Sequence, residues 1–173
     1  MPTKGGPTSP ISLVLPNIYL GPASAASSAG LLASKSITHV LSVGAKPSSP
    51  VEGVHYARIS LNDTPESSIV KVCDEASTII DAALASRNGA ILVHCSAGIS
   101  RSPMVVTAYL MRKHDMTLKA ALRQILQVRP QTSPNPGFLQ QLKELELELR
   151  GEVSLNVDQL PKREKDRLEL LAE

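Results

Sequence analysis

Aromatic residues are scarce in this chain, which has one Phe, three Tyr and no Trp among its 173 residues. Any hydrophobic core must therefore be aliphatic, although a hydrophobic content of 42% is ordinary for a globular protein. No apolar run approaches the roughly 20 residues that a membrane-spanning helix needs. The net charge of +2 is too small to indicate nucleic-acid binding by itself.

Cysteine is also rare, since Cys73 and Cys95 are the only two. Two cysteines do not make a disulfide framework, and a reducing compartment would keep a nucleophilic thiol active. Residues 1–10 carry one Lys and lack the apolar stretch of a secretory signal. We therefore expect an intracellular protein, cytoplasmic or nuclear or both, that binds neither a membrane nor nucleic acid.

The length predicts one main domain, over residues 11–150. Residues 1–10 are rich in Pro, Gly, Ser and Thr and are predicted to be disordered. Residues 151–173 are strongly charged and are predicted to form a solvated tail or a short surface helix. These patterns do not indicate an oligomeric state.

Between residues 11 and 150, short apolar segments alternate with segments of helical periodicity. The predicted strands are 11–15, 18–20, 37–43, 54–61 and 90–93. The predicted helices are a weak one at 24–34, one from the N-cap Ser68 to Asn88-Gly89, one from Arg101 to Arg112, one from Thr117 to about Val128, and one from Asn135-Pro136 with Phe138, Leu142, Leu145 and Leu149 on a single apolar face. This alternation predicts a single α/β domain whose central, mostly parallel mixed sheet is covered by helices.

One short loop carries the chemistry. Residues 93–102 read Val-His-Cys-Ser-Ala-Gly-Ile-Ser-Arg-Ser, which is the pattern H-C-x-x-G-x-x-R-S. Cys95 supplies a sulfur nucleophile and Arg101 a planar guanidinium that can grip two phosphoryl oxygens. Between them, the backbone N–H groups of Ser96, Ala97, Gly98, Ile99 and Ser100 can surround a tetrahedral dianion, and Gly98 lets the backbone curl. The loop therefore predicts cleavage of a phosphate ester through a cysteinyl-phosphate.

The surroundings of Cys95 favour its thiolate form. A free thiol has a pKa of about 8.5, and helix N-termini and nearby cations lower it. The loop amides, the N-terminus of the helix predicted from Arg101 and the charge of Arg101 all act in this direction. The hydroxyl of Ser102 can hydrogen-bond the sulfur and help it leave when water cleaves the intermediate.

The leaving group needs a proton, and a general acid typically contributes about 10²–10⁴-fold to the rate. Asp63 is the candidate acid, because it follows the predicted strand 54–61 and loops after parallel strands meet at one sheet edge. Glu66, in the same polar loop, is the competing candidate.

This constellation resembles the cysteine-dependent protein phosphatases of the protein tyrosine phosphatase superfamily, specifically the small dual-specificity phosphatases. Where strictly tyrosine-specific members tend to have Gly-Arg-Thr, this chain has Ser100-Arg101-Ser102. The resemblance runs from about Val14 to Leu149 and includes segments 15–21, 37–41, 62–64 and 134–138. Nothing upstream corresponds to the kinase-docking domain of larger relatives, which favours the small, atypical class.

The resemblance implies an enzyme that hydrolyses phosphotyrosine and phosphoserine/threonine in phosphorylated proteins, on a central sheet with helices on both faces. It implies Cys95 as the nucleophile, Arg101 as the phosphate ligand, Asp63 as the general acid and Ser102 as a helper in hydrolysis. Asn135 resembles a polar residue that braces the active-site loops.

Each of these residues also has a purely structural interpretation. Cys95 could be an inert buried thiol, Asp63 a turn residue and Asn135 a plain N-cap. His94 is expected to be structural, with its ring bonded to the loop backbone. Cys73 lies on the apolar face of its predicted helix and is expected in the core, with a regulatory disulfide to Cys95 as the alternative.

No cofactor is expected, and a metal site is not expected either, because His39, His55 and His114 are scattered along the sequence. The competing activities are those of a phosphoinositide or phospho-carbohydrate phosphatase, a rhodanese-like sulfur transferase and a phospho-binding pseudoenzyme. Ala97 and Ile99 occupy positions where lipid-directed relatives often place Lys, which disfavours a polyanionic substrate. Asp63 and the sequence Ser102-Pro103 argue against sulfur transfer, and a pseudoenzyme would normally lack the nucleophile.

Overall fold

The computed structural model describes residues 9–172, so most of the segment 1–10 that is predicted to be disordered lies outside the described residues. Five strands form one sheet in the order β1-β2-β5-β3-β4. They are β1 (Ser12–Leu15), β2 (Ile18–Gly21), β3 (His39–Val43), β4 (His55–Ile59) and β5 (Ile91–His94). β1 pairs antiparallel with β2, and the other three neighbouring pairs are parallel. The predicted mixed, mostly parallel sheet is confirmed.

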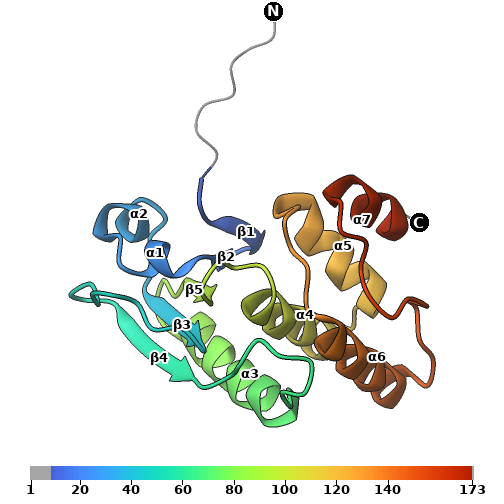
Figure 1. Cartoon of the computed structure of the whole chain (residues 1–173). Coiled ribbons are helices and arrows are strands. Elements are labelled where there is room, and N and C mark those ends of the chain that lie inside the picture. The colour runs from blue at the N-terminus through green and yellow to red at the C-terminus, as the bar shows by residue number, and fades with distance from the viewer. Residues whose placement is uncertain (1–8, 173) are drawn as a thin grey trace, which may run out of the picture.

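Helices cover both faces of this sheet (Figure 1). They are α1 (Ala23–Ala26), α2 (Ala29–Ser34), α3 (Val70–Ala85), α4 (Arg101–Lys113), α5 (Leu118–Val128), α6 (Pro136–Arg150) and α7 (Glu164–Leu171). Side chains alternate between faces along a strand. In β5, Leu92 accordingly packs into the smaller apolar cluster with α1 and α2, whereas Ile91 and Val93 join the main cluster with α3 to α6.

Parallel pairing places the chemistry at one edge of the sheet. Cys95 directly follows β5, and Asp63 lies in the loop after β4. Because β3, β4 and β5 run in the same direction, their carboxyl ends share this edge, which is where α/β sheets usually bind ligands.

Two predicted N-caps are confirmed and one is wrong. Thr117 accepts a hydrogen bond from the backbone N of Ala120, and Asn135 accepts one from Phe138. Ser68 does not cap α3, because the helix begins after Ile69, which makes no side-chain cap. The backbone N–H of Ile69 instead donates to Gln141 Oε1 at 3.0 Å, so α6 supplies the missing acceptor.

The segment after Gly151 forms the short helix α7, one of the two predicted alternatives, but it is only partly solvated. Leu155, Leu160 and Leu171 are buried in the main apolar cluster, and Arg167 is 4% exposed. Helix α7 packs against α5, which Figure 1 shows at the C-terminal side of the molecule. Three widely spaced leucines anchor the segment although charged residues dominate its composition.

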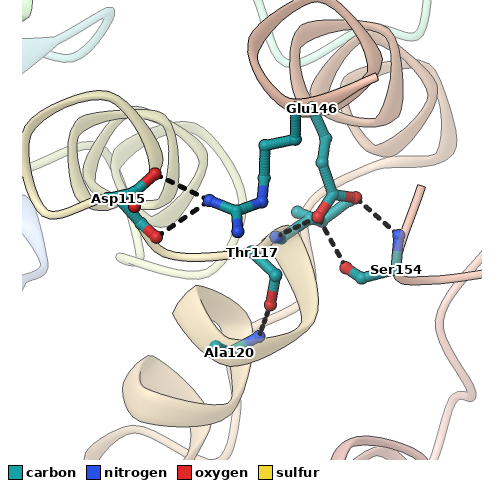
Figure 2. Close-up of polar contacts among 7 residues, drawn as sticks. Asp115, Thr117, Ala120, Glu146 and Ser154 are labelled. Carbon is teal, nitrogen blue, oxygen red and sulfur yellow. Dashed lines mark hydrogen bonds and ion pairs between the residues drawn. The ribbon is translucent and has the colours of Figure 1, made fainter. Parts of the chain in front are cut away.

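The buried carboxylate of Glu146 joins this segment to the domain (Figure 2). Its Oε1 accepts hydrogen bonds from the backbone N of Leu118 at 2.8 Å and from Ser154 Oγ at 2.7 Å, and its Oε2 accepts from Ser154 N at 2.8 Å. Arg150 pairs with Asp115 beside it at 2.7 Å. A buried carboxylate is tolerated only when it is paired in this way, so Glu146 fixes the start of α5 to the chain that follows α6.

Candidate active site

Cys95 lies where the apolar strand β5 meets the N-terminus of α4. Its side chain is 3% exposed, and Sγ is 3.2 Å from the hydroxyl of Ser102, a fully buried residue in the first turn of α4. Cys73 lies in the core, as expected, with its Sγ 3.7 Å from Met104 Sδ. Both cysteines are free.

The two thiols have opposite electrostatic environments. Burial raises the pKa of Cys95, but hydrogen bonds from the Ser102 side chain and from the Ser102 and Gly98 amides, with the charge of Arg101, outweigh burial and leave this pKa below its ordinary value. Burial raises the pKa of Cys73 to about 12. Cys95 is therefore the sulfur that can ionise and act as a nucleophile.

The backbone of the Cys95–Arg101 loop turns its carbonyl groups outward. The Ser96 carbonyl accepts a hydrogen bond from Ala23 N, and the Ala97 and Gly98 carbonyls accept from Arg129 Nη2 and Nε. The Ile99 carbonyl accepts from Ser133 N and the Ser100 carbonyl from Met104 N. All five distances are 2.7–3.0 Å. The carbonyl of Cys95 itself is bonded to the ring of His94. In a trans peptide the C=O and the following N–H point in opposite directions. The N–H groups of Ser96 through Arg101 therefore converge on the inside of the loop, on the side of Cys95.

Arg129, which the sequence analysis did not single out, holds this arrangement from behind. It is 3% exposed, and its Nε and Nη2 donate to the carbonyls of Gly98 and Ala97 at 2.7 and 3.0 Å. Its Nη1 donates to the Pro10 carbonyl at 3.1 Å and to Ser12 Oγ at 3.3 Å. One buried guanidinium thus ties the Cys95–Arg101 loop to the chain that enters β1.

Gly98 is required by this close packing. Its φ of +69° lies in the left-handed region, and a Cβ would come within 2.6 Å of the Gly21 carbonyl oxygen and 2.7 Å of Arg129 Nη2. The glycine that the sequence motif demands thus lets the loop curl and lets Arg129 reach its carbonyls.

The side chain of Arg101 folds back across the loop. Its Nη2 donates to Ser96 Oγ at 2.8 Å and its Nη1 to the Leu61 carbonyl at 3.2 Å. Gly44, with a φ of +84°, lies directly against the guanidinium, where a Cβ would collide with it. Arg101 is therefore held beside the inward-facing amides.

Asp63 is bound to the rim of the same loop. Its Oδ1 accepts hydrogen bonds from Ser100 Oγ at 2.7 Å and from Asn135 Nδ2 at 2.9 Å, and the backbone N of Asn135 donates to Ser100 Oγ at 3.0 Å. Three segments far apart in the sequence meet here. Glu66 is exposed and, within the described part of the chain, has no hydrogen bond to the loop.

The histidines fall into different environments. His94 is fully buried, with Nε2 2.7 Å from Ser42 Oγ and Nδ1 2.9 Å from the Cys95 carbonyl, and burial lowers its pKa. It therefore lies behind the loop rather than in it. His39 and His55 are separated in the sequence, but adjacent strands bring their ring centroids to 4.9 Å.

Comparison with known proteins agrees with this geometry. Residues 18–148 match the family model described as "Dual specificity phosphatase, catalytic domain". The chain is 41% identical to dual specificity protein phosphatase 1 of Arabidopsis thaliana over 137 residues, which are 78% of this chain and 68% of that protein. It is 36% identical to mouse dual specificity protein phosphatase 15 over 162 residues, 91% of this chain and 68% of the relative.

Solved structures show the same likeness. The crystal structure of human DUSP28 superposes with a TM-score of 0.76 at 33% identity, covering 82% of this chain and 96% of that one. No helix in residues 9–172 combines the length and the apolar character needed to cross a bilayer. The family match, the named relatives and the shared fold agree with one another, and the chain belongs to the dual specificity phosphatases, enzymes that act on phosphorylated substrates.

Proposed function

We propose that this protein hydrolyses phosphotyrosine and phosphoserine/threonine in proteins through a phosphate ester of Cys95. The observation that carries the proposal is the set of outward carbonyls at Ser96 to Ser100, which leaves the loop amides facing the sulfur. Preorganised N–H groups of this kind stabilise charge that develops on a transferring phosphoryl group.

In the first step, the Cys95 thiolate attacks phosphorus. The S–P bond forms while the bond from phosphorus to the ester oxygen breaks. The loop amides and Arg101 hold the three other oxygens, and Asp63 gives its proton to the departing oxygen. Both hydrogen bonds to Asp63 go to Oδ1, so Oδ2 is the atom that carries this proton.

In the second step, water attacks the phosphorus and loses a proton to Asp63. The S–P bond breaks and the electron pair returns to sulfur. The Ser102 hydroxyl, 3.2 Å from Sγ, donates a hydrogen bond to the thiolate as it leaves. Free phosphate is released, and both Cys95 and Asp63 return to their starting protonation states.

The loop composition favours a substrate with a single phosphoryl group at the site. Arg101 is the only cationic side chain between Cys95 and Ser102, and the positions of Ala97 and Ile99 carry no charge. Arg129 contacts the outer side of the loop through carbonyl groups, so it adds no ligand inside. A headgroup with several phosphates would find little additional positive charge here.

A substrate panel tests the proposal. Purified protein, with and without EDTA, is assayed on phosphopeptides with matched tyrosine and threonine sites, on a phosphoinositide and on a phosphoglucan. We expect turnover of both peptides, no effect of EDTA and weaker turnover of the other two substrates. Preference for the phosphoinositide or the glucan would overturn the protein substrate class.

Variants test the mechanism. Cys95→Ser should abolish turnover and retain phosphopeptide binding, and retained turnover would refute the covalent route.

Asp63→Asn should lower the rate and remove the alkaline limb of the pH profile, whereas the control Glu66→Gln should keep that limb. The reverse pattern would assign the acid to Glu66.

A further inference from the structure

His39 and His55 lie side by side as the first residues of β3 and β4, at the opposite end of the strands from the Cys95–Arg101 loop. They are register partners in the parallel pair β3 and β4, and their ring planes are tilted by 32°. His39 also pairs with Ile91, the first residue of β5, whereas Cys95 follows the last one. His55 is exposed and His39 half-buried, so an ion can reach both rings from solvent.

Thr38 can support a metal-binding form of His39. The Thr38 hydroxyl lies 2.7 Å from His39 Nδ1 and 3.1 Å from the Ala90 carbonyl, and it accepts a hydrogen bond from Ala90 N at 3.0 Å. A metal at Nε2 would place the ring proton on Nδ1. In that tautomer Nδ1 donates to Thr38 Oγ, and the Thr38 hydroxyl donates to the Ala90 carbonyl.

This arrangement is the one that metal-binding histidines adopt. A coordinating imidazole usually donates its second ring N–H to an oxygen, which fixes the tautomer and the ring orientation. The ring of His55 has no hydrogen-bond partner within residues 9–172, so either of its nitrogens can serve as a ligand. Imidazole nitrogen suits Zn²⁺, Ni²⁺ and Cu²⁺.

We propose that His39 and His55 form a two-histidine binding site for a divalent transition metal ion, with Zn²⁺ as the probe. Among residues 9–172 no third His, Cys, Asp or Glu joins the pair, so water completes the coordination. The site is separate from the Cys95 chemistry, and its presence or absence leaves the proposed function untouched.

Electrostatics support this assignment. Burial and the neighbouring His55 lower the pKa of His39, which keeps its ring in the neutral form that metals require. The other two histidines serve as comparisons. Both ring nitrogens of His94 are occupied, and His114 is exposed beside Tyr109 with no second histidine.

Calorimetric titration with ZnCl₂ tests the site on the full chain. All proteins carry Cys95→Ser, because a thiolate would bind Zn²⁺ itself. We expect one site that is lost in His39→Asn and in His55→Asn and is unchanged in the matched control His114→Asn. No binding by the parent, or equal binding by the double variant of His39 and His55, would overturn the proposal.

Variants of Thr38 provide a second test. Their Zn²⁺ affinity should change only if the Thr38 hydroxyl supports the metal-binding tautomer of His39. Loss of an outer hydrogen bond to a ligand typically costs about 10–100-fold in metal affinity. Thr38→Val should therefore weaken Zn²⁺ binding to this extent, while Thr38→Ser, which keeps the hydroxyl, should restore it. Thermal melts show that the variants are folded, and imidazole NMR should show Zn²⁺ shifting Nε2 of His39. Equal affinity in both Thr38 variants contradicts the tautomer argument.

Discussion

At the level of single residues, reactivity in this protein depends on hydrogen bonds that oppose burial. Cys73 and Cys95 are both buried, yet their pKa values move in opposite directions. The difference comes from the Ser102 side chain, two backbone amides and Arg101, all of which stabilise a negative sulfur at position 95. Burial alone would have made Cys95 inert.

Ser102→Ala should raise the pKa of Cys95. It removes a hydrogen bond to a charged group, worth about 1.5–3 kcal/mol, so we expect a loss of about tenfold in rate at neutral pH. Fewer molecules then carry the thiolate at a given pH, and the acid limb of kcat/KM moves to higher pH. The pH dependence of iodoacetamide alkylation measures this shift directly. The exposed hydroxyl variant Ser34→Ala is the control, and an unmoved limb would contradict the role of Ser102.

Arg129→Met should loosen the Cys95–Arg101 loop. The carbonyls of Ala97 and Gly98 lose their donors, at a cost of about 1–3 kcal/mol for each carbonyl left unpaired. We expect lower stability in urea unfolding and weaker competitive inhibition by inorganic phosphate. Arg123→Met, within α5, should change neither. Normal phosphate affinity in Arg129→Met would show that the loop holds its shape without this residue.

At the level of secondary structure, the start of α6 serves two purposes. Asn135 caps the helix through its Oδ1 and donates to Asp63 through its Nδ2. Thr117 caps α5 in the same way but makes no contact with the site. The two caps therefore allow helix stability to be separated from positioning of the acid.

Asn135→Ala and Thr117→Ala should each lower the unfolding free energy by about 1 kcal/mol, the usual cost of losing a cap. Only Asn135→Ala should lower kcat, because Asn135, unlike Thr117, donates a hydrogen bond to Asp63. Asn135→Ser, which can still cap, should recover stability without recovering kcat. Equal kcat in the two alanine variants would reduce Asn135 to a plain N-cap. Urea melts and steady-state kinetics supply the two measurements.

Contacts local to the chain could be predicted from the sequence, whereas contacts between distant elements could not. Cys95, the loop amides and Arg101 are contiguous, so their pattern alone indicated the loop. Arg129 reaches that loop from the end of α5, and His39 meets His55 only through strand register. No periodicity or motif marks such pairings, because they depend on how the elements pack.

At the level of the whole molecule, the segment after Gly151 belongs to the folded domain. Its leucines enter the main cluster, and Glu146 and Arg167 bind its backbone. The charged composition of the segment led to the prediction that it is solvated, because composition does not show that a few apolar side chains can anchor a polar segment. The same limitation affected α6, where helical spacing predicted Leu149 on the buried face but the residue is 48% exposed.

Leu171→Ala should therefore destabilise the entire domain. Its side chain is fully buried, and such truncations cost about 2–5 kcal/mol. Leu149→Ala makes the matched control, and an exposed change of this kind stays within about 0.5 kcal/mol. Urea unfolding measures both. A small effect at Leu171 would indicate that α7 detaches without loss of the core.

The outward carbonyls of the Cys95–Arg101 loop have one more consequence. Because their partners are already in place, the loop needs no rearrangement to receive an anion and loses little conformational entropy when it does so. Orthophosphate has the same tetrahedral oxygens as the transferred group, so we expect it to bind the same loop and to inhibit competitively with the substrate.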